Sequence, residues 1–269
     1  MRQFAGKVAV ITGAGSGIGR ALALNLAARG ARLAVSDVDV TRAAETAAHC
    51  EKAGAEARSY VLDVADRAAV LAHADAVRAD FGQVNLVVNN AGVALMSDFA
   101  SMSWDDLDWI VGVNFWGVVH GSKAFLPHLI DSGDGHLVNI SSVFGLIAVP
   151  TQSAYNATKF AVRGVTEALR QELRLAGHPV GVSCVHPGGI KTNIARDARG
   201  IPEAERGGKR FDEIALTTPE KAARTILRGV EREQAKILVG PDAYLLDALP
   251  RVLGSAYQRV VSAVVKRAL

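Results

Sequence analysis

The chain has little cysteine and no long apolar run, and each shortage excludes a class of protein. Its 269 residues include two cysteines, Cys50 and Cys184, which lie far apart in the sequence. They form neither the disulfide framework of a small secreted domain nor a cluster of metal ligands, and they suit a reducing cytosol. No uninterrupted apolar run approaches the roughly 20 residues of a membrane-spanning helix. We therefore expect a cytoplasmic protein with no membrane span.

The arrangement of charged residues and histidines argues against binding of nucleic acid or a metal ion. The formal net charge is +3, and the basic residues are interspersed with acidic ones rather than gathered in a block. A nucleic-acid groove needs such a block, so nucleic acid is not expected as a partner. The seven histidines are scattered without the paired spacing of zinc ligands, and we expect no metal. The N-terminal residues 1–13 are interpreted as a strand leading into a glycine loop rather than as a signal peptide.

Short apolar runs recur along the chain and alternate with longer segments of helical spacing. The runs are rich in Val, Ile and Leu and barely alternate in polarity, as expected of strands buried on both faces. Strand–helix alternation predicts an α/β fold with a doubly wound parallel sheet of seven strands and helices on both faces. The length and the 49% hydrophobic content fit one large domain, residues 1–269. The predicted strands are residues 7–12, 32–37, 58–63, 85–90, 136–141, 180–185 and 236–240.

A glycine-rich loop, "ITGAGSGIGR", joins the first predicted strand to the first helix. Its glycines Gly13, Gly17 and Gly19 are spaced G-x-x-x-G-x-G, with Ser16 and Ile18 between them. Glycines in such a loop permit a tight turn, a close approach of backbone to a pyrophosphate, and packing of helix on strand. Free N–H groups at the helix N-terminus favour the phosphates. The loop predicts a Rossmann-type dinucleotide site; the alternative is an ordinary glycine-rich turn.

Two carboxylates that end strands bear on the nature of the nucleotide. Asp37 ends the second predicted strand, 18 residues after Gly19, and could accept both hydroxyls of an adenosine ribose while repelling a 2′-phosphate. No arginine follows it directly, so NAD is favoured over NADP; the alternative is a turn or cap residue. Asp63 could accept from the adenine amine, with Val64 against the ring, or it could be the N-cap of the next helix.

Several motifs in fixed order make the chain resemble the short-chain dehydrogenase/reductase family over about residues 5–240. They are "TGAGSGIG", "NNAG" at 89–92, "NFWG" with Asn114, Ser142 thirteen positions before Tyr155, "YNATK", and "PGGIKT" at 187–192. In combination these motifs are far more specific than any one alone. The resemblance implies an oxidoreductase that transfers hydride to or from a nicotinamide dinucleotide. Family members are commonly homotetramers, so a homo-oligomer, dimer or tetramer, is expected.

The resemblance also implies roles for individual residues, and elementary chemistry supports them. Tyrosine has a pKa near 10, and Lys159, one helical turn after Tyr155, is expected to lower it. Tyr155 would then be the general base or acid, Ser142 would hold the substrate oxygen, and Asn114 would hold a water linking Lys159 to solvent. Lys159 would also bond the nicotinamide ribose. The implied cofactor-binding residues are Gly13, Ser16, Gly17, Ile18, Gly19, Asp37, Asp63, Val64, Asn90, Ala91, Gly92, Tyr155, Lys159, Pro187, Gly188, Ile190 and Thr192.

Each of these residues also has a purely structural interpretation. The serine before Val143 could cap the end of a strand, and Asn114 could be a helix residue bonded to backbone. Asn90 is expected to support the strand end, and His186 to be a packed residue rather than an acid or base. A catalytically silent nucleotide-binding scaffold is therefore retained as an alternative to an NAD-dependent enzyme, as is an NADP-dependent carbonyl reductase.

The substrate and the two irregular segments are less sharply predicted. Apolar residues dominate the expected pocket, so a hydrophobic secondary alcohol or ketone is predicted. A polar stretch, about residues 193–216, is expected to be a lid. The extension, about residues 241–269, is amphipathic and could pack on its own domain, form a subunit interface or contact a membrane surface. The pocket candidates are Ala94, Val143, Phe144, Gln152 and Gly189, and the amphipathic stripe comprises Tyr257, Val260, Val261, Val264 and Val265.

Overall fold

The computed structural model describes residues 1, 3–200 and 215–268, and side chains up to residue 266. Seven parallel strands form one sheet in the order β3-β2-β1-β4-β5-β6-β7, as the strand–helix alternation predicted. Each predicted strand is present within two residues of its predicted bounds. The strands are β1 (Val8–Thr12), β2 (Arg32–Asp37), β3 (Ala57–Val61), β4 (Leu86–Asn89), β5 (Gly135–Ile140), β6 (Val180–Pro187) and β7 (Lys236–Val239).

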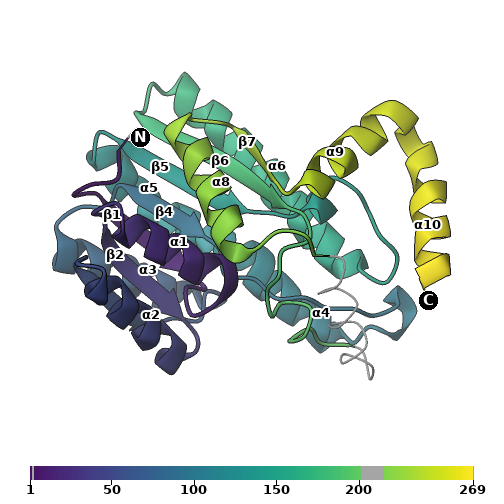
Figure 1. Ribbon diagram of the computed structural model, residues 1–269, viewed down its shortest axis with the longest axis horizontal. Helices are drawn as coiled ribbons and strands as arrows, with labels where there is room; N and C mark the ends of the chain where they lie inside the picture. Colours follow the sequence, from purple (N-terminus) through teal and green to yellow (C-terminus); the bar gives the residue numbers. More distant parts are fainter. Residues whose placement is uncertain (2, 201–214, 269) are drawn as a thin grey trace.

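Helices cover both faces of this sheet (Figure 1). On one face, α1 (Gly17–Ala27), α2 (Val40–Lys52) and α8 (Pro219–Glu231) enclose an apolar core that includes Leu22, Leu26 and Ile226. On the other face, α3 (Arg67–Phe81), α5 (Gly117–Asp131) and α6 (Ser153–Leu175) enclose a second core with Phe125 and Leu137. This two-faced cover explains why the central strands are continuous apolar runs.

The edge strand β3 departs from the expectation that every strand is buried on both faces. Its residues Arg58 and Ser59 are exposed, and Val61 is 63% exposed. It pairs only with β2 in the sheet order, so it lacks the second neighbour and the full helical cover of the central strands. The expectation that residues 58–63 are buried on both faces is therefore wrong for this edge strand.

The sheet topology decides where a ligand site can form. β1 and β4 are neighbours, yet β1 leads through α1 toward β2 on one side and β4 leads toward β5 on the other. Strand order reverses between them, and in sheets of this kind ligands usually bind outside the carboxyl ends of the strands at such a point. The loops that follow Thr12 and Asn89 carry the predicted "TGAGSGIG" and "NNAG" motifs.

Between β4 and β5 the helical segment is not uniformly α-helical. After the short η1 (Phe99–Ser101), α4 (Trp104–Val111) continues into a π-helical turn, Gly112–Trp116, before α5 begins. Such turns occur frequently at functional sites because they redirect side chains that a regular helix would space evenly. This π-helical turn carries Asn114.

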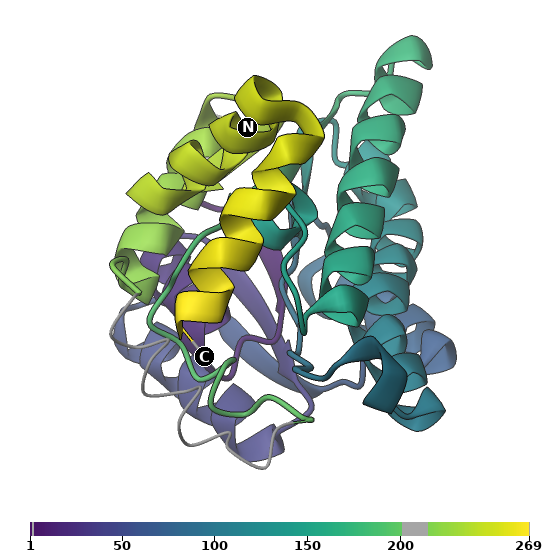
Figure 2. The same ribbon diagram turned by 90° about the vertical axis from the view of Figure 1, so that its right-hand side faces the viewer.

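The C-terminal extension consists of two helices that leave the sheet beyond β7 (Figure 1). α9 (Pro241–Leu253) is joined by a 3-10 turn, η4 (Gly254–Ala256), to α10 (Tyr257–Ala268), which runs across the face seen in Figure 2. The hydroxyl of Tyr257 accepts a hydrogen bond from the Ala148 backbone N–H at 3.1 Å. Val260 and Val264 are 44% and 62% exposed, so the described part of the chain does not bury the whole amphipathic stripe.

Residues 201–214, most of the predicted lid, lie outside the described residues, and its remaining parts are attached to the body on both sides. Arg199 forms a bridge with Leu95, and its guanidinium lies 3.8 Å from the centroid of the Trp109 ring. Thr217 forms a bridge with Ile190. Among the described residues, no helix combines the length and apolarity needed to cross a membrane.

Candidate active site

The glycine loop begins the candidate site at the carboxyl end of β1. Gly13 and Gly17 have φ angles of +62° and +51°, in the left-handed region that suits glycine. Gly19 faces the loop itself, and a Cβ at this position would overlap the Gly13 carbonyl oxygen. The three glycines of the motif are therefore each required by the local backbone.

Within residues 1, 3–200 and 215–266, no side chain caps the N-terminus of α1. Ser16 is the N-cap residue, but its side chain makes no capping hydrogen bond, and no acidic residue lies in the first turn. By contrast, α2, α3, α4 and α8 each have a side chain that caps their first turn. The first-turn N–H groups of α1 are therefore available to an anion, which the helix macrodipole also favours.

The "NNAG" loop connects this glycine loop to the centre of the candidate site. Asn90 Nδ2 donates to the carbonyl oxygens of Thr12 and Gly13 at 2.9 and 3.1 Å, and the Thr12 hydroxyl accepts from the Asn90 and Ala91 N–H groups. A Cβ on Gly13 would lie 2.8 Å from Ala91 Cα, and one on Gly92 would lie 3.4 Å from Lys159 Nζ. The Asn90 side chain thus has the structural contact that the sequence predicted.

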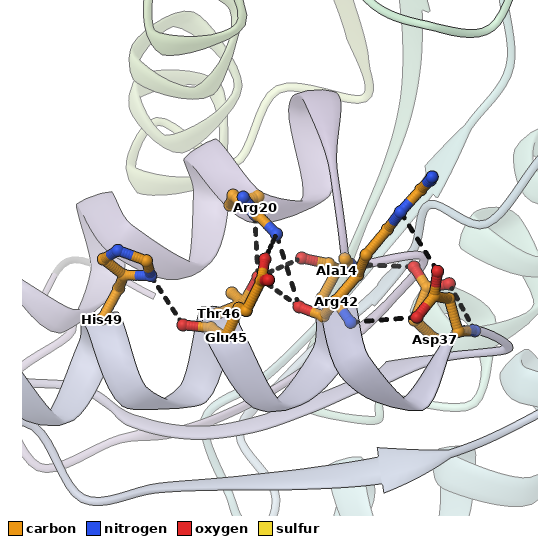
Figure 3. Close-up of polar contacts among 9 residues, drawn as sticks. Ala14, Arg20, Asp37, Arg42, Glu45, Thr46 and His49 are labelled. Atoms are coloured by element: carbon orange, nitrogen blue, oxygen red, sulfur yellow. Dashed lines mark hydrogen bonds and ion pairs between the residues drawn. The ribbon is translucent and has the colours of Figure 1, made fainter.

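Asp37 lies at the end of β2, beside the glycine loop (Figure 3). Its Oδ2 accepts from the Gly15 N–H at 2.8 Å, and its Oδ1 accepts from the Asp39 N–H at 3.0 Å. Each carboxylate oxygen has a second lone pair, so Asp37 retains capacity for further donors such as hydroxyls. Arg42, which sequence reasoning did not consider, lies on the same side of α2 as Asp37 (Figure 3).

The interpretation of Asp63 as a helix N-cap is wrong. Its Oδ1 accepts from the Ala65 N–H at 2.9 Å within a turn, and the N-cap of α3 is Asp66, whose carboxylate accepts from the Ala68 and Ala69 N–H groups. Val64, predicted to contact an adenine ring, is only 6% exposed. Its side chain packs in the core against Gly117 at the start of α5, where a Cβ would lie 3.0 Å from Val64 Cβ.

The helix α6 places Tyr155 and Lys159 on one face, next to the end of β5. The two residues are one turn apart, and Lys159 Nζ lies 5.5 Å from the centroid of the Tyr155 ring. The ammonium donates to the Ile140 carbonyl oxygen at 3.1 Å, and the Lys159 side chain is 3% exposed. Among the described residues no carboxylate forms an ion pair with it. Lys159 is therefore a buried residue and does not lie on a solvated helix face.

Ser142 follows β5 and caps the short η3 helix (Val143–Gly145). Its hydroxyl accepts from the Phe144 N–H at 3.1 Å, which is the capping contact that the structural interpretation expected. The neighbouring Ser141 hydroxyl donates to the Lys159 carbonyl oxygen at 2.8 Å and so fixes η3 to α6. The Ser142 side chain also acts on the Tyr155 phenol, whose pKa it lowers. The structure thus brings Ser142, Tyr155 and Lys159 together.

The pKa of Tyr155 is raised in the chain alone, contrary to the expectation that Lys159 depresses it. Burial disfavours the phenolate and raises the pKa of Tyr155 to about 12, against the smaller opposing effect of Ser142. Burial also disfavours the ammonium and lowers the pKa of Lys159 to about 8. The reason is that both groups are desolvated, and Lys159 directs its nitrogen to the Ile140 carbonyl rather than to the phenol oxygen.

Asn114 is bonded to backbone in the way the structural alternative described. It is fully buried; its Oδ1 accepts from the Val93 N–H at 2.8 Å and its Nδ2 donates to the Val93 carbonyl at 2.9 Å. Nδ2 also lies 3.4 Å from the Thr158 hydroxyl on α6. The side chain therefore joins the "NNAG" loop, the π-helical turn and α6, and its expected role toward a water molecule stays a prediction.

The "PGGIKT" segment closes the other side of the site. Pro187 ends β6, and Ile190, 3% exposed, is part of the core shared with α1. A Cβ on Gly17 would lie 3.1 Å from Thr192 Cγ2, so this segment reaches the start of α1. The Gly189 N–H donates to Asp242 Oδ2 at 2.6 Å, and the same carboxylate fills the space where Gly188 lacks a side chain.

His186 is a packed residue, in agreement with the sequence interpretation. It is fully buried, and burial lowers its pKa to about 4, so the ring is neutral near pH 7. Its Nδ1 lies 2.9 Å from the Ser142 carbonyl oxygen and donates to it, since a carbonyl can only accept. His186 therefore fixes the backbone that carries the Ser142 hydroxyl.

Apolar side chains pack against Tyr155. Phe144 meets its ring edge to face with 6.1 Å between ring centroids. A cluster on the loop after β4, on α4 and on α6 packs against the same residue. Among the other pocket candidates, Val143 and Gln152 are buried, and Ala94 accepts from the Arg199 N–H. The cluster consists of Leu95, Ile110 and Ala154 with Val93, Met102, Leu107, Trp109 and Val111.

Sequence reasoning missed three residues that take part in this arrangement: Thr12, Arg42 and Asp242. Thr12 accepts from two N–H groups of the "NNAG" loop, and Asp242 accepts from Gly189 across 53 residues of sequence. Thr12 belongs to a strand-end motif and could have been suspected. Arg42 and Asp242 lie in helices outside every motif, and their positions depend on how α2 and α9 pack.

Comparison with known proteins shows the family of the chain. The model of the short chain dehydrogenase family matches residues 7–200. A Mycobacterium tuberculosis protein named "Putative oxidoreductase SadH" is 58% identical over 266 residues, which cover 98% of this chain and 96% of the relative. The solved structure of a short chain dehydrogenase/reductase from Burkholderia phymatum, in complex with NAD, is 36% identical, with a TM-score of 0.89; 94% of this chain and 95% of that one are covered.

A further solved structure shows that the relatives differ in cofactor. A metagenomic short-chain oxidoreductase in complex with NADP is 30% identical, with a TM-score of 0.72, over 88% of this chain and 97% of that one. The chain belongs to the short-chain dehydrogenase/reductase family. It is an oxidoreductase of CH–OH groups, and the family as a whole uses NAD or NADP.

Proposed function

We propose that the chain is an NAD-dependent oxidoreductase that interconverts a hydrophobic secondary alcohol and its ketone, with Tyr155 as the acid or base. One observation carries the proposal: the glycine loop, the "NNAG" loop and Lys159 lie next to one another in space. A Cβ on Gly13 would lie 2.8 Å from Ala91 Cα, and one on Gly92 would lie 3.4 Å from Lys159 Nζ. A nucleotide bound along this line would extend from α1 to Tyr155. These three parts of the site are the ones that we propose hold one continuous ligand.

The residues of this line fit a dinucleotide. The N–H groups of Gly17 and its neighbours at the uncapped start of α1 suit the pyrophosphate, and the free lone pairs of Asp37 suit the ribose hydroxyls. The short contact between Gly17 and Thr192 brings "PGGIKT" to the same end of α1. When bound, the nicotinamide would accept or deliver the hydride.

The proton chemistry belongs to the chain itself. In alcohol oxidation, Tyr155 would accept the proton of the substrate hydroxyl; in ketone reduction it would donate one to the substrate oxygen. The Ser142 hydroxyl would hold that oxygen as charge develops on it. Because burial raises the pKa of Tyr155 to about 12, a nearby positive charge has to favour the phenolate during oxidation. Protonated Lys159 supplies part of this charge.

An apolar substrate is supported by the surroundings of Tyr155. Phe144 on η3 and the cluster around Leu95 and Ile110 pack against Tyr155 and surround it mainly with carbon. Burying a polar or charged substrate group against these side chains would cost its hydration without an evident partner. A secondary alcohol with a hydrophobic body would keep its single hydroxyl at Ser142 and Tyr155 and bury the rest.

We extend the proposal to the organisation of the chain. Residues 1–269 would be one catalytic domain with a lid over about residues 193–216, of which the described ends are attached at Leu95 and Ile190. The exposed apolar residues Leu245 and Val252 on α9 support burial against another copy in a homo-oligomer. Cys50 and Cys184 are buried free thiols, which supports a cytoplasmic location.

The test is a screen of the purified chain with NAD and a panel of cyclic, aromatic and long-chain secondary alcohols. We expect NADH formation with at least one hydrophobic member and weaker activity with short polar alcohols. Parallel assays with NADP and the matching ketones test the second candidate, an NADP-dependent carbonyl reductase, which Arg42 beside Asp37 favours. Tight dinucleotide binding with no turnover in either direction would favour the silent scaffold.

A further inference from the structure

Backbone hydrogen bonds beside the candidate site join three segments that are far apart in the sequence. The Met96 N–H donates to the carbonyl oxygen of Arg199, in the lid, at 2.9 Å. The Ser97 N–H donates to the carbonyl oxygen of Thr151 at 3.0 Å. The loop after β4 is therefore bonded to the lid and also to the segment between η3 and α6. We call this arrangement the belt, and it consists of residues 94–97, residues 146–152 and Arg199.

The belt lies next to the groups that we propose act on the substrate. Residues 146–152 connect η3, whose N-cap is Ser142, to α6, which carries Tyr155. Leu95, in the loop after β4, belongs to the apolar cluster that packs against Tyr155. A substrate whose oxygen is held by Ser142 and Tyr155 has to place its hydrophobic body against neighbouring surfaces. The position of the belt therefore affects how closely the pocket fits that body.

One residue of the belt has a backbone conformation that its surroundings have to maintain. Thr151 has a φ angle of +63°, in the left-handed region that residues other than glycine rarely adopt. Such a conformation is unfavourable by itself and persists where neighbouring contacts determine it. Toward α6, Asn156 Nδ2 donates to the Val149 carbonyl oxygen at 3.0 Å. Ala148 lies on the exposed side of the same segment, where a different element provides the contact.

The C-terminal helix α10 provides this contact on the exposed side. The Tyr257 hydroxyl accepts the Ala148 N–H at 3.1 Å. Tyr257, Val261 and Val265 are half-buried and lie one helical turn apart, so one face of α10 is turned toward the body as the helix crosses it (Figure 2). Among the described residues, the hydrogen bond of Tyr257 is the one that joins α10 to the belt.

We propose that Tyr257 is a positioning residue of the substrate pocket, because its hydroxyl attaches α10 to the belt and so fixes the wall formed by residues 146–152. The inference rests on the proposed function and concerns the fit of the substrate. The contacts that hold the reacting groups do not pass through α10: Ser142 is bonded to Phe144, and Lys159 to Ile140. Loss of the Tyr257 hydroxyl should therefore weaken binding of a bulky substrate and leave proton transfer and dinucleotide binding nearly unchanged.

Two variants test the inference with NAD and with cyclohexanol, 1-phenylethanol or decan-2-ol, whichever the parent chain converts fastest. Tyr257→Phe keeps the ring but removes the acceptor of the Ala148 N–H. We expect KM to rise about threefold, with kcat and the dissociation constant for NADH within about twofold of the parent values. Tyr257→Ala also removes the ring that packs on the body, so KM should rise about tenfold with the same small change in kcat.

Amide hydrogen exchange of the peptide that contains residues 146–152 gives a readout that needs no substrate. Exchange should be about threefold faster in Tyr257→Phe than in the parent, because local opening of this segment is no longer opposed by α10. The matched control is Tyr244→Phe, which changes a tyrosine that is 63% exposed on α9 and should alter neither KM nor exchange.

The outcomes separate the inference from the proposed function. An active parent with unchanged KM in both Tyr257 variants would overturn the inference. A fall in kcat or in NADH affinity as large as the rise in KM would also overturn it, since that pattern indicates a general loss of structure. A parent chain that converts none of the three alcohols would instead count against the proposed function, and the exchange measurement would still decide whether Tyr257 holds the belt.

Discussion

Lys159 Nζ lies 5.5 Å from the centroid of the Tyr155 ring and donates to the Ile140 carbonyl oxygen rather than to the phenol. This hydrogen bond attaches α6 to the end of β5, and any effect of the lysine on the phenol has to come from its charge. A buried ammonium in this position favours phenolate, while burial of the phenol opposes it. The balance between these effects decides how readily Tyr155 exchanges a proton.

Replacing Tyr155 by Phe should abolish proton transfer while retaining the packing of the ring. We expect turnover to fall by about three orders of magnitude and the dissociation constant for NADH to change by less than about threefold. Steady-state rates and a binding titration on the same preparation measure both effects. Tyr244→Phe, which changes a tyrosine that is 63% exposed on α9, is the matched control and should retain full turnover. Substantial turnover by Tyr155→Phe would contradict the assigned role.

Two glycine-to-alanine substitutions distinguish a glycine that the glycine loop needs for steric reasons from a glycine that only lowers helix stability. Gly19→Ala places a Cβ against the Gly13 carbonyl oxygen and should displace the loop, so that NADH binding weakens at least tenfold. Gly164→Ala, in α6, meets nothing within 4 Å and should stabilise the chain by about 0.5–1 kcal/mol. Urea unfolding and a cofactor titration test the pair, and equal binding by the two variants would refute the steric argument.

Asp242 is predicted to support the "PGGIKT" segment from outside the family motifs. Asp242→Ala removes the acceptor of the Gly189 N–H and opens space beside Gly188, so the segment should lose its fixed position. We expect the dissociation constant for NADH to rise about fivefold, because the half-buried Gly189 N–H loses a charge-assisted hydrogen bond that holds the segment in place. Asp242→Asn can still accept from Gly189 and should restore most of the affinity. Equal loss in both variants would show that the charge, rather than the hydrogen bond, matters.

The buried His73 should make the folded chain less stable as the pH falls. It is buried between Tyr60 and Phe125, and neither ring nitrogen has a hydrogen-bond partner in the described part of the chain. Burial lowers its pKa to about 4 from 6.5. As the pH falls below 6.5 the unfolded chain gains a proton that the folded chain resists until about pH 4. The stability from the neutral ring is therefore present above pH 6.5 and lost on acidification, by about 3 kcal/mol at most.

Replacing His73 by Phe should reduce this pH dependence, because the variant keeps an aromatic ring but cannot bind the proton. Free energies of unfolding from urea titrations at several values between pH 7 and pH 4.5 provide the measurement. The parent chain should lose more stability over this interval than His73→Phe. His49→Gln, on the exposed face of α2, should follow the parent. Parallel curves for the parent and His73→Phe would show that other groups cause the acid sensitivity.

Much of the fold was predictable because its signals are local. Strands in the centre of a parallel sheet are apolar runs, and their order of alternation with helices limits the topology to few arrangements. The edge strand β3 was misjudged because composition reports apolarity, while exposure at Val61 depends on the absence of a second neighbour. Asp63 was misjudged as a cap because α3 begins at Arg67, and Asp66 is its N-cap.

For the candidate site, too, some features follow from the local sequence and others depend on tertiary packing. The sequence by itself determined that the glycine loop needs its glycines and that Tyr155 and Lys159 lie one helical turn apart. Both follow from backbone geometry over a few residues. Only the tertiary structure decided that Asn114 bonds Val93, that Asp242 bonds Gly189, and that Arg42 lies beside Asp37. It also decided the direction of the Tyr155 pKa shift. The physical reason is that these contacts and desolvation depend on which distant segments pack together, and spacing along the chain does not encode that packing.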